Sequence, residues 1–134
     1  MKTYQLSKMG KLLHTTGAVK CKTGIASIDL LVDTGSTFTI LPWEHLIAIG
    51  YEPATQVDTV RILAANGYVI APRYKSEWFS CLGLSFKSFP IVVHTLPSRL
   101  SSFGLLGMDF LHRAKAQIDV FHGQIITEAV EAAL

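Results

Sequence analysis

Charged residues are scarce in this chain of 134 residues: Asp, Glu, Lys and Arg make up 16%, whereas the apolar set AVILMFWYC makes up 49%. A typical soluble chain has about 25% charged residues, and disordered chains combine high charge with low hydrophobicity. The composition therefore excludes a disordered protein and predicts a single domain over residues 1–134, with a core over about 12–127. The low charge also indicates that a partner covers part of the surface.

Long apolar runs are absent too. The longest runs have four residues, as in Leu46–Ile49, far short of the roughly 20 that a membrane-spanning helix needs. The N-terminus lacks the apolar core and cleavage site of a secretory signal peptide. We therefore expect no membrane partner and a cytoplasmic location. Two cysteines, Cys21 and Cys81, are too few for a disulfide framework and are expected as free buried thiols.

Neither a basic stripe nor a metal-binding spacing is present. The net charge is +2, and each half of the chain holds six Lys/Arg against five Asp/Glu, which argues against a nucleic-acid partner. The five histidines are scattered, so no metal or other cofactor is expected. The first acidic residue, Asp29, follows five lysines, which form either a solvated edge or a contact with an acidic surface: Lys2, Lys8, Lys11, Lys20 and Lys22.

The pattern of apolar residues and turns predicts a mainly β fold with two short helices. Asn66-Gly67 is a strong hairpin signal, because both residues tolerate positive φ. The expected elements up to this turn are strands over 12–21 and 25–33, a helix over 43–49 and a long hairpin over 57–79. The later ones are a hairpin with Gly83 in its turn and 89–95 as its returning strand, a short strand over 105–107, a helix over 110–115 capped by Asp109, and a hairpin over 116–127.

The most informative segment is LVDTGS, residues 31–36. Asp33 leaves an apolar strand and enters a tight turn, so its carboxylate is expected to be rigid and partly desolvated. Gly35 allows the backbone to turn and to approach a partner closely. Thr34 offers a hydroxyl group, and Ser36 is placed to donate a hydrogen bond to the Asp33 carboxylate. By itself this triplet is also an ordinary turn composition.

Three motifs in this order resemble the retropepsin-like aspartic proteases, in particular their soluble bacterial branch. They are LVDTGS at 31–36, AANG at 64–67 and LLGMDFL at 105–111. Their spacing covers roughly residues 12–127. The resemblance implies a single-domain, half-pepsin closed β-sheet fold with a flap hairpin.

The resemblance also implies an aspartic endopeptidase. Such hydrolysis needs two carboxylates that share one proton, and aspartic proteases are the standard case of this dyad. The chain has one D-T-G, so the resemblance implies a twofold homodimer in which Asp33 of each copy forms the dyad. The substrates would be extended peptides with apolar flanks. A Ser36 donor to the ionised carboxylate would lower the apparent pKa of the dyad and give an acidic pH optimum.

Further roles follow from the same resemblance. Thr34 would bond across the twofold axis, and Gly35 would let the two loops approach. Leu105, Leu106 and Gly107 form the second apolar-Gly segment. The flap, which folds over substrate and excludes water, comprises Ala64, Ala65, Asn66, Gly67 and Tyr68. Tyr68 either bonds near the substrate or anchors the flap base.

Some assignments stay open. Five residues are either cleft walls or ordinary core: Ile40, Leu41, Ile62, Val69 and Leu105. Retroviral members often carry an acid soon after D-T-G and an Arg after the second segment, where this chain has Thr37-Phe38 and Met108. An ionic lock of the dimer is therefore not expected. Residues 129–134 either continue as a short helix or fray.

Two other functions fit the same residues. One is a non-catalytic, retropepsin-like dimerisation and interaction module, although such a module does not need a desolvated acid. The other is a metal-dependent hydrolase that uses Asp33 with His94 or His112.

Overall fold

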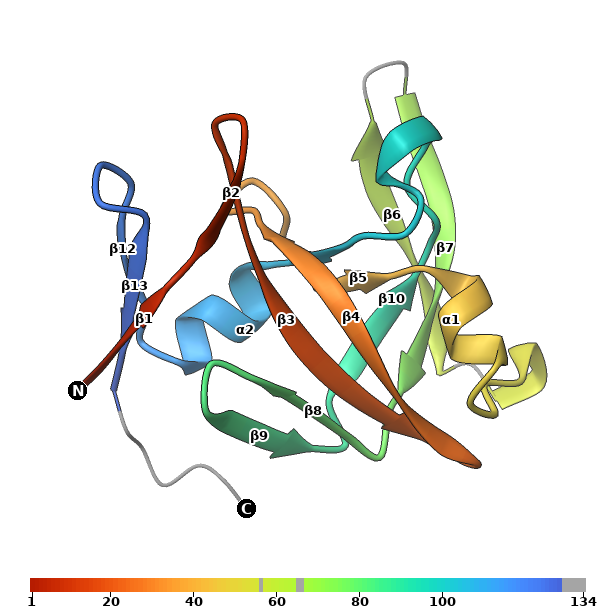
Figure 1. Ribbon diagram of the computed structural model, residues 1–134. Helices are drawn as coiled ribbons and strands as arrows, with labels where there is room; N and C mark the ends of the chain where they lie inside the picture. Colours follow the sequence, from red (N-terminus) through yellow and green to blue (C-terminus); the bar gives the residue numbers. More distant parts are fainter. Residues whose placement is uncertain (56, 65–66, 129–134) are drawn as a thin grey trace.

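The computed structural model describes residues 1–55, 57–64 and 67–128 (Figure 1). Within these ranges the chain forms a curled ten-stranded sheet, a three-stranded sheet and two short α-helices. The prediction of a mainly β fold with two short helices is confirmed. None of the helices in the described ranges is long and apolar enough to cross a bilayer.

The elements follow one another in short steps. Those before the long hairpin are β1 (Lys2–Gln5), β2 (Ser7–Met9), β3 (Leu12–Cys21), β4 (Gly24–Val32), β5 (Ile40–Leu41), α1 (Trp43–Ile47) and the 3₁₀ turn η1 (Pro53–Thr55). The middle of the chain forms β6 (Asp58–Ala64), β7 (Gly67–Lys75), β8 (Trp78–Cys81), β9 (Leu84–Lys87) and β10 (Pro90–Val93). The last elements are η2 (Ser98–Leu100), β11 (Gly104–Leu106), α2 (Met108–Arg113), β12 (Gln117–Asp119) and β13 (Gln124–Thr127).

The order of strands in the large sheet is β6-β7-β10-β5-β11-β4-β3-β8-β9, with β2 added beside β3. Most neighbours are antiparallel, but β4 runs parallel to β11 and β5 runs parallel to β10. These parallel pairs bring segments far apart in sequence to the middle of the sheet. The loop that follows β4 therefore lies next to the loop that follows β11.

The core beneath the sheet is rich in aromatic rings. Phe79, Phe86, Phe89 and Phe110 are almost fully buried, and their ring centroids lie 5.4–6.1 Å apart. Phe110 brings α2 into this cluster, so the packing of the rings fixes the helix against β8 and β9. Aromatic pairs at this separation add to the free energy gained by apolar burial.

Both cysteines are free and buried, as the sequence predicts. Desolvation by burial raises the pKa of the Cys81 thiol to about 12. Burial also raises the pKa of the Cys21 thiol, against an opposing hydrogen bond with Tyr74. Both side chains therefore stay protonated and unreactive over the physiological pH range.

The second hairpin differs from the prediction. Gly83 does lie in a turn, but the returning strand is β9, and residues 89–95 do not return to β8. Their strand β10 crosses instead to lie between β7 and β5. The reason is burial, because Ile91, Val92 and Val93 are at most 4% exposed and need cover on both faces. Helix α1 is also shorter than predicted, ending at Ile47.

The two end strands of the described chain lie side by side. β1 pairs with β13 from Lys2↔Thr127 to Gln5↔Gln124, and β13 also pairs with β12 (Figure 1). The final hairpin is therefore formed as predicted, with β1 as its third strand. The alternatives for residues 129–134 lie outside the described residues.

Candidate active site

Asp33 stands at the end of β4, where the parallel pair β4–β11 stops. Its backbone N–H donates to the carbonyl oxygen of Leu106 at 3.1 Å, which ties the loop to β11. The N–H of Gly35 donates to the Asp33 carboxylate oxygen Oδ1 at 2.8 Å. The carboxylate is thus held by its own turn, and the Asp33 side chain is half-buried.

The predicted hydrogen bond from Ser36 to the Asp33 carboxylate is wrong. The Ser36 hydroxyl donates instead to the carbonyl oxygen of Phe38 at 2.6 Å. The backbone N–H of Ser36 donates to the carbonyl oxygen of Asp33 at 3.2 Å, which closes the turn. The side chain therefore faces along the loop, and Gly35 supplies the donor that was expected from Ser36.

The segment after β11 holds the loop that carries Asp33 in place through backbone hydrogen bonds. The N–H of Met108 donates to the carbonyl oxygen of Ser36 at 2.8 Å, and the N–H of Asp109 donates to that of Thr37 at 3.2 Å. A Cβ atom on Gly107 would collide with the carbonyl group of Phe38. Only glycine permits this close approach of two backbones, so Gly107 is required by the loop's position.

Asp109 links the two segments through its side chain, a role different from the helix cap that the sequence predicts. Its Oδ1 accepts hydrogen bonds from the Thr39 hydroxyl and the Phe110 N–H, both at 2.7 Å, and its Oδ2 accepts from the Thr39 N–H at 3.0 Å. Thr39 is fully buried. Burial raises the pKa of Asp109, although these hydrogen bonds oppose the shift.

The predicted helix cap at Asp109 is therefore wrong. The capping position of α2 is Gly107, and Asp109 lies in the first helical turn. The signal that was available in the sequence is an acid directly after Gly-Met in the motif, together with a Thr six residues after Asp33.

A cavity of about 270 Å³ opens above Asp33, between the loop and the β6–β7 hairpin. Of the five open wall assignments, Ile40, Ile62 and Leu105 line it. Leu41 is fully buried in the main core instead, and Val69 is not part of the described lining. Asp33 is the acidic residue of this lining, and Ile40 and Leu105 form the apolar wall beside it.

The β6–β7 hairpin covers one side of that cavity. Its strands pair up to Leu63↔Tyr68 and Ala64↔Gly67, while Ala65 and Asn66 lie outside the described residues. Tyr68 lies near the tip, is 64% exposed and has the Arg61 guanidinium 5.3 Å from its ring centroid, so it does not anchor the base.

An ion pair holds the base of the hairpin. Arg73 on β7 donates to both carboxylate oxygens of Asp58 on β6, from Nε at 2.9 Å and from Nη2 at 2.7 Å. The guanidinium of Arg73 also lies 5.9 Å from the ring centroid of Phe38. The base of the hairpin is thus joined to the loop that carries Asp33.

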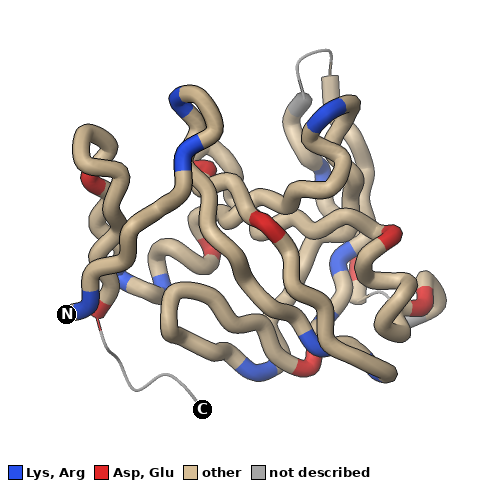
Figure 2. The backbone as a smooth tube through the Cα atoms, in the orientation of Figure 1, with Lys and Arg blue, Asp and Glu red and all other residues tan. Residues whose placement is uncertain are grey.

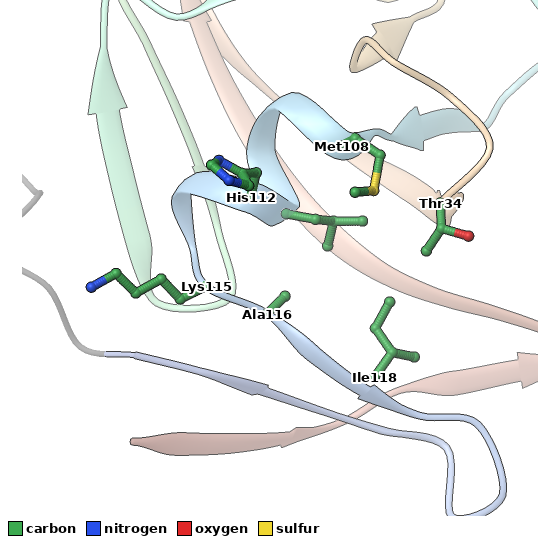
Figure 3. A pocket seen from close by; sticks show the side chains of 7 residues that line it. Thr34, Met108, His112, Lys115, Ala116 and Ile118 are labelled. Carbon is green, nitrogen blue, oxygen red and sulfur yellow. The ribbon is translucent and has the colours of Figure 1, made fainter.

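A second hollow, of about 340 Å³, lies on the other side of the loop (Figure 3). Thr34 borders it on one side, and Met108 and Ile118 from α2 and β12 border it on the other. Met108 is 40% exposed and occupies the position at which an Arg was noted in retroviral chains. No hydrogen bond joins the Thr34 hydroxyl to another residue of the described ranges, so this hydroxyl is available to a partner.

The residues of the metal-hydrolase alternative are not brought together. Asp33 lines the cavity under the hairpin, His112 lines the hollow beside Thr34, and His94 lines a third cavity near Trp43. Within the described ranges, no group of three or more His, Cys, Asp or Glu side chains could hold a metal ion. The arrangement thus offers one carboxylate, apolar walls and a covering hairpin.

Comparisons with known proteins agree with this arrangement. A family model described as "Aspartyl protease" matches residues 19–110, from β3 into α2. No curated protein matches the sequence. The crystal structure of a retropepsin-like aspartic protease from Rickettsia conorii is similar, with a TM-score of 0.70 and 22% identity over 94% of this chain and 89% of that chain. The EIAV protease complexed with the inhibitor HBY-793 gives a TM-score of 0.65 and 18% identity over 84% of this chain and 97% of that chain.

Proposed function

This chain belongs to the aspartyl protease family and has the retropepsin-like fold, and from that premise we propose that two copies of it form one peptide-hydrolysing site. Family and fold support aspartic protease activity. The proposal adds that the active unit is a homodimer, that Asp33 of each copy is the catalytic residue, and that the substrates are extended peptides with apolar flanks.

One observation carries the proposal. Asp33 is the acidic member of the cavity lining, and its carboxylate is oriented by the Gly35 N–H. The other carboxylate near the loop, Asp109, accepts three hydrogen bonds from Thr39 and Phe110 and is not part of the described cavity lining. Each chain thus supplies half of a dyad, and the second half must come from a second copy.

The chemistry then follows from the two carboxylates. The ionised Asp33 takes a proton from water as the water oxygen bonds to the carbonyl carbon of the peptide. The protonated Asp33 of the other copy donates its hydrogen bond to the carbonyl oxygen, which becomes a hydroxyl group in the tetrahedral intermediate. When the C–N bond breaks, the Asp33 that took the proton from water passes it to the amine nitrogen. A hydroxyl group of the intermediate gives its proton to the other Asp33, and a carboxylic acid and an amine are released.

The second copy would approach over Thr34. This side chain is exposed, and its hydroxyl is available for the bond across the twofold axis. The hollow with Met108 and Ile118 lies on the same side of the loop. Apolar contact in this hollow would replace the ionic lock that the chain lacks, so the dimer should depend little on salt concentration.

The expected pH optimum remains acidic. The proposed mechanism needs one ionised and one protonated carboxyl group, and a pair of carboxyl groups holds its shared proton at acidic pH. Cleavage should therefore increase as the pH falls from neutral, and a profile that peaks above neutral pH would contradict the proposal.

The test compares the wild type with Asp33→Asn on a library of apolar decapeptides at several pH values. The matched control is Asp29→Asn, which changes an exposed acid on the same strand that accepts a surface hydrogen bond from the Thr16 hydroxyl. Asp33→Asn should lose at least about 10³-fold in kcat/KM, because the base that activates water is gone. Asp29→Asn should retain activity.

A mixing experiment tests the shared site directly. With a tenfold excess of Asp33→Asn, the specific activity of the wild-type chains should fall to about one tenth, because most of them pair with an inactive copy. The same excess of Asp29→Asn should cause no loss. Equal activity of wild type and Asp33→Asn would favour a non-catalytic module, and an unchanged rate in the mixture would exclude the shared dyad.

A further inference from the structure

The cavity above Asp33 holds one cationic side chain that the proposed mechanism does not use. Arg61 lines it from the β6 strand of the hairpin, next to Ile62 and Leu63. Together with Asp33 it is the charged part of the described lining, and the rest is apolar or carries hydroxyl groups. Arg61 is exposed in the free chain, and its charge attracts a ligand group of opposite charge.

The guanidinium of Arg61 has no carboxylate partner within 4.0 Å in the part of the chain that the structure describes. Its contact is the ring of Tyr68, whose centroid lies 5.3 Å away and which keeps the side chain along the hairpin. The other arginine of this hairpin, Arg73, already binds Asp58 through two hydrogen bonds. Arg113 packs on Phe86 at 3.9 Å from the ring centroid. Arg61 is thus the arginine of the cavity lining, and in the described ranges its donors are not taken up by a carboxylate.

Further positive charge lies on the same side of the molecule. The β2–β3 turn rises on the side of the molecule where the β6–β7 hairpin stands, and it carries Lys11 (Figure 2). No acidic residue precedes Asp29 in the sequence, so this turn has no acid of its own. Lys11 does not line the cavity, so it adds less than Arg61 to the attraction of a negatively charged ligand.

We propose that Arg61 makes the enzyme selective for peptides that carry Asp or Glu close to the scissile bond, at the position covered by the hairpin. This inference rests on the proposed protease function and names its substrate class. The five donors of a guanidinium group match a carboxylate in two parallel hydrogen bonds. Closure of the hairpin over the peptide would exclude water from this pair and strengthen it.

In the proposed homodimer, the preference for an acidic side chain applies on both sides of the scissile bond. Two copies of Arg61 stand on opposite sides of the dyad, related by the same twofold axis. An acidic side chain is therefore favoured at two positions, at equal distances before and after the scissile bond. A substrate with an acid at both positions would use both arginines.

The experiment uses peptides that differ only in having Glu, Gln or Lys at one position, which is scanned over the residues on both sides of the cleaved bond. At pH 6 the wild type should cleave the best Glu peptide about tenfold faster in kcat/KM than its Gln counterpart, and the Lys peptide slowest. The preference should decline below about pH 4, where a free Glu takes up its proton. Raised salt should reduce it only in part, since the pair is sheltered.

Three variants separate this role from a structural one. Arg61→Gln should cleave Glu and Gln peptides equally, Arg61→Lys should keep part of the preference, and Arg61→Glu should favour Lys. The matched control is Arg99→Gln in η2, an exposed arginine outside the cavity, which should keep the wild-type pattern.

The outcomes also distinguish the two proposals. Cleavage by the wild type with equal rates for Glu, Gln and Lys peptides, or a Glu preference that survives in Arg61→Gln, would overturn the role of Arg61 and leave the protease intact. A wild type no more active than Asp33→Asn on every peptide would overturn the proposed function, and the selectivity with it.

Discussion

The loop that carries Asp33 and the β6–β7 hairpin face each other across one cavity, yet they are held in opposite ways. The loop is fixed by backbone bonds to Leu106, Met108 and Asp109 and ends at the fully buried Thr39. The described part of the hairpin is tied at its base by Asp58 and Arg73. Beyond the base it exposes large apolar side chains, with Leu63 at 76%, Tyr68 at 64% and Ile70 at 62%.

This difference fits two functions, with the loop carrying the reacting group and the hairpin closing over the substrate. Groups that react must be held within a fraction of an ångström of their working geometry, so a loop that carries them needs support from several directions. A segment that closes over a ligand needs few contacts of its own in the open state, because it makes them with the ligand. Leu63, which lines the cavity above Asp33, is the exposed apolar side chain that such closure would bury, whereas Ile70 lines the separate cavity near Trp43.

Replacing Gly107 with Ala should loosen the loop that carries Asp33, so that it is no longer held more firmly than the hairpin. We expect the largest effect on stability from this change. The new Cβ would collide with the carbonyl group of Phe38, so the backbone of one segment must move. We expect a loss of about 3–5 kcal/mol in the free energy of unfolding and loss of peptide cleavage. Urea unfolding and a kinetic assay on the same preparation measure both.

The control for this variant is Gly10→Ala. Gly10 has nothing within 4 Å of an added Cβ, but its φ of +62° is costly for other residues. This change should therefore cost about 1–2 kcal/mol and leave kcat unchanged. A Gly107→Ala protein as stable as Gly10→Ala would show that the loop adjusts without strain.

Asp109→Asn should have an intermediate effect, and its pH dependence is the sharper readout. The amide nitrogen would face the Thr39 N–H, so two donors would oppose each other at a cost of about 1–3 kcal/mol. The folded state raises the pKa of Asp109, so the stabilisation from the protonated carboxyl group is complete below the unfolded pKa of about 3.9. It is lost as the pH increases through the folded pKa.

The difference in unfolding free energy between wild type and Asp109→Asn should therefore shrink as the pH increases above about 4. Urea unfolding at a series of pH values measures it, with Asp29→Asn as a variant that should show no such trend. A difference that grows with pH would mean that the hydrogen bonds from Thr39 outweigh the desolvation of Asp109.

The smallest effects on stability are expected from two neighbouring positions of the hairpin. Their comparison separates a side chain that packs in the free chain from one that is exposed. Ile62 packs against the cluster of Ile40, Ala71 and Val92, so Ile62→Ala should cost about 1–2 kcal/mol and also raise KM. Leu63→Ala should stay within about 0.5 kcal/mol of wild type, because its side chain is 76% exposed.

The kinetics of the same pair test the closure of the hairpin. Leu63→Ala should raise KM several-fold while its thermal midpoint stays unchanged, since the side chain would be buried only against bound peptide. An unchanged KM would show that the hairpin does not use this surface for closure. Peptide cleavage with thermal unfolding on each variant separates the two results.

The sequence predicts those parts of the fold that depend on neighbouring residues, such as turns and the ends of strands. Asn66-Gly67 predicted the long hairpin, which β6 and β7 form with Gly67 as the first residue of β7. The apolar residues before Asp33 predicted that it follows a strand, and the last part of β4 is indeed buried at Leu30 and Leu31. Two of the motifs also marked which loops meet, since β4 and β11 are neighbours. The course of β10 could not be predicted, because its partners β5 and β7 are selected by burial in three dimensions.

The partners of single side chains were harder still. A hydroxyl group such as that of Ser36 can reach several acceptors within two residues, and only the φ and ψ angles of the loop decide between Asp33 and Phe38. The role of Asp109 depends on Thr39, which lies 70 positions away in the chain. The motifs mark both positions, but the sequence does not show that these two side chains bond to each other.

The two sulfhydryl groups suggest a practical use for labelling. Cys21 and Cys81 are the chain's entire thiol content, and both are sequestered with a raised pKa. A cysteine introduced at Ile70 would be the one group that maleimide or nitroxide reagents modify, without prior removal of the natural ones. Spin-echo distances between two such probes would report, in one measurement, whether copies associate and how far apart their hairpins stand.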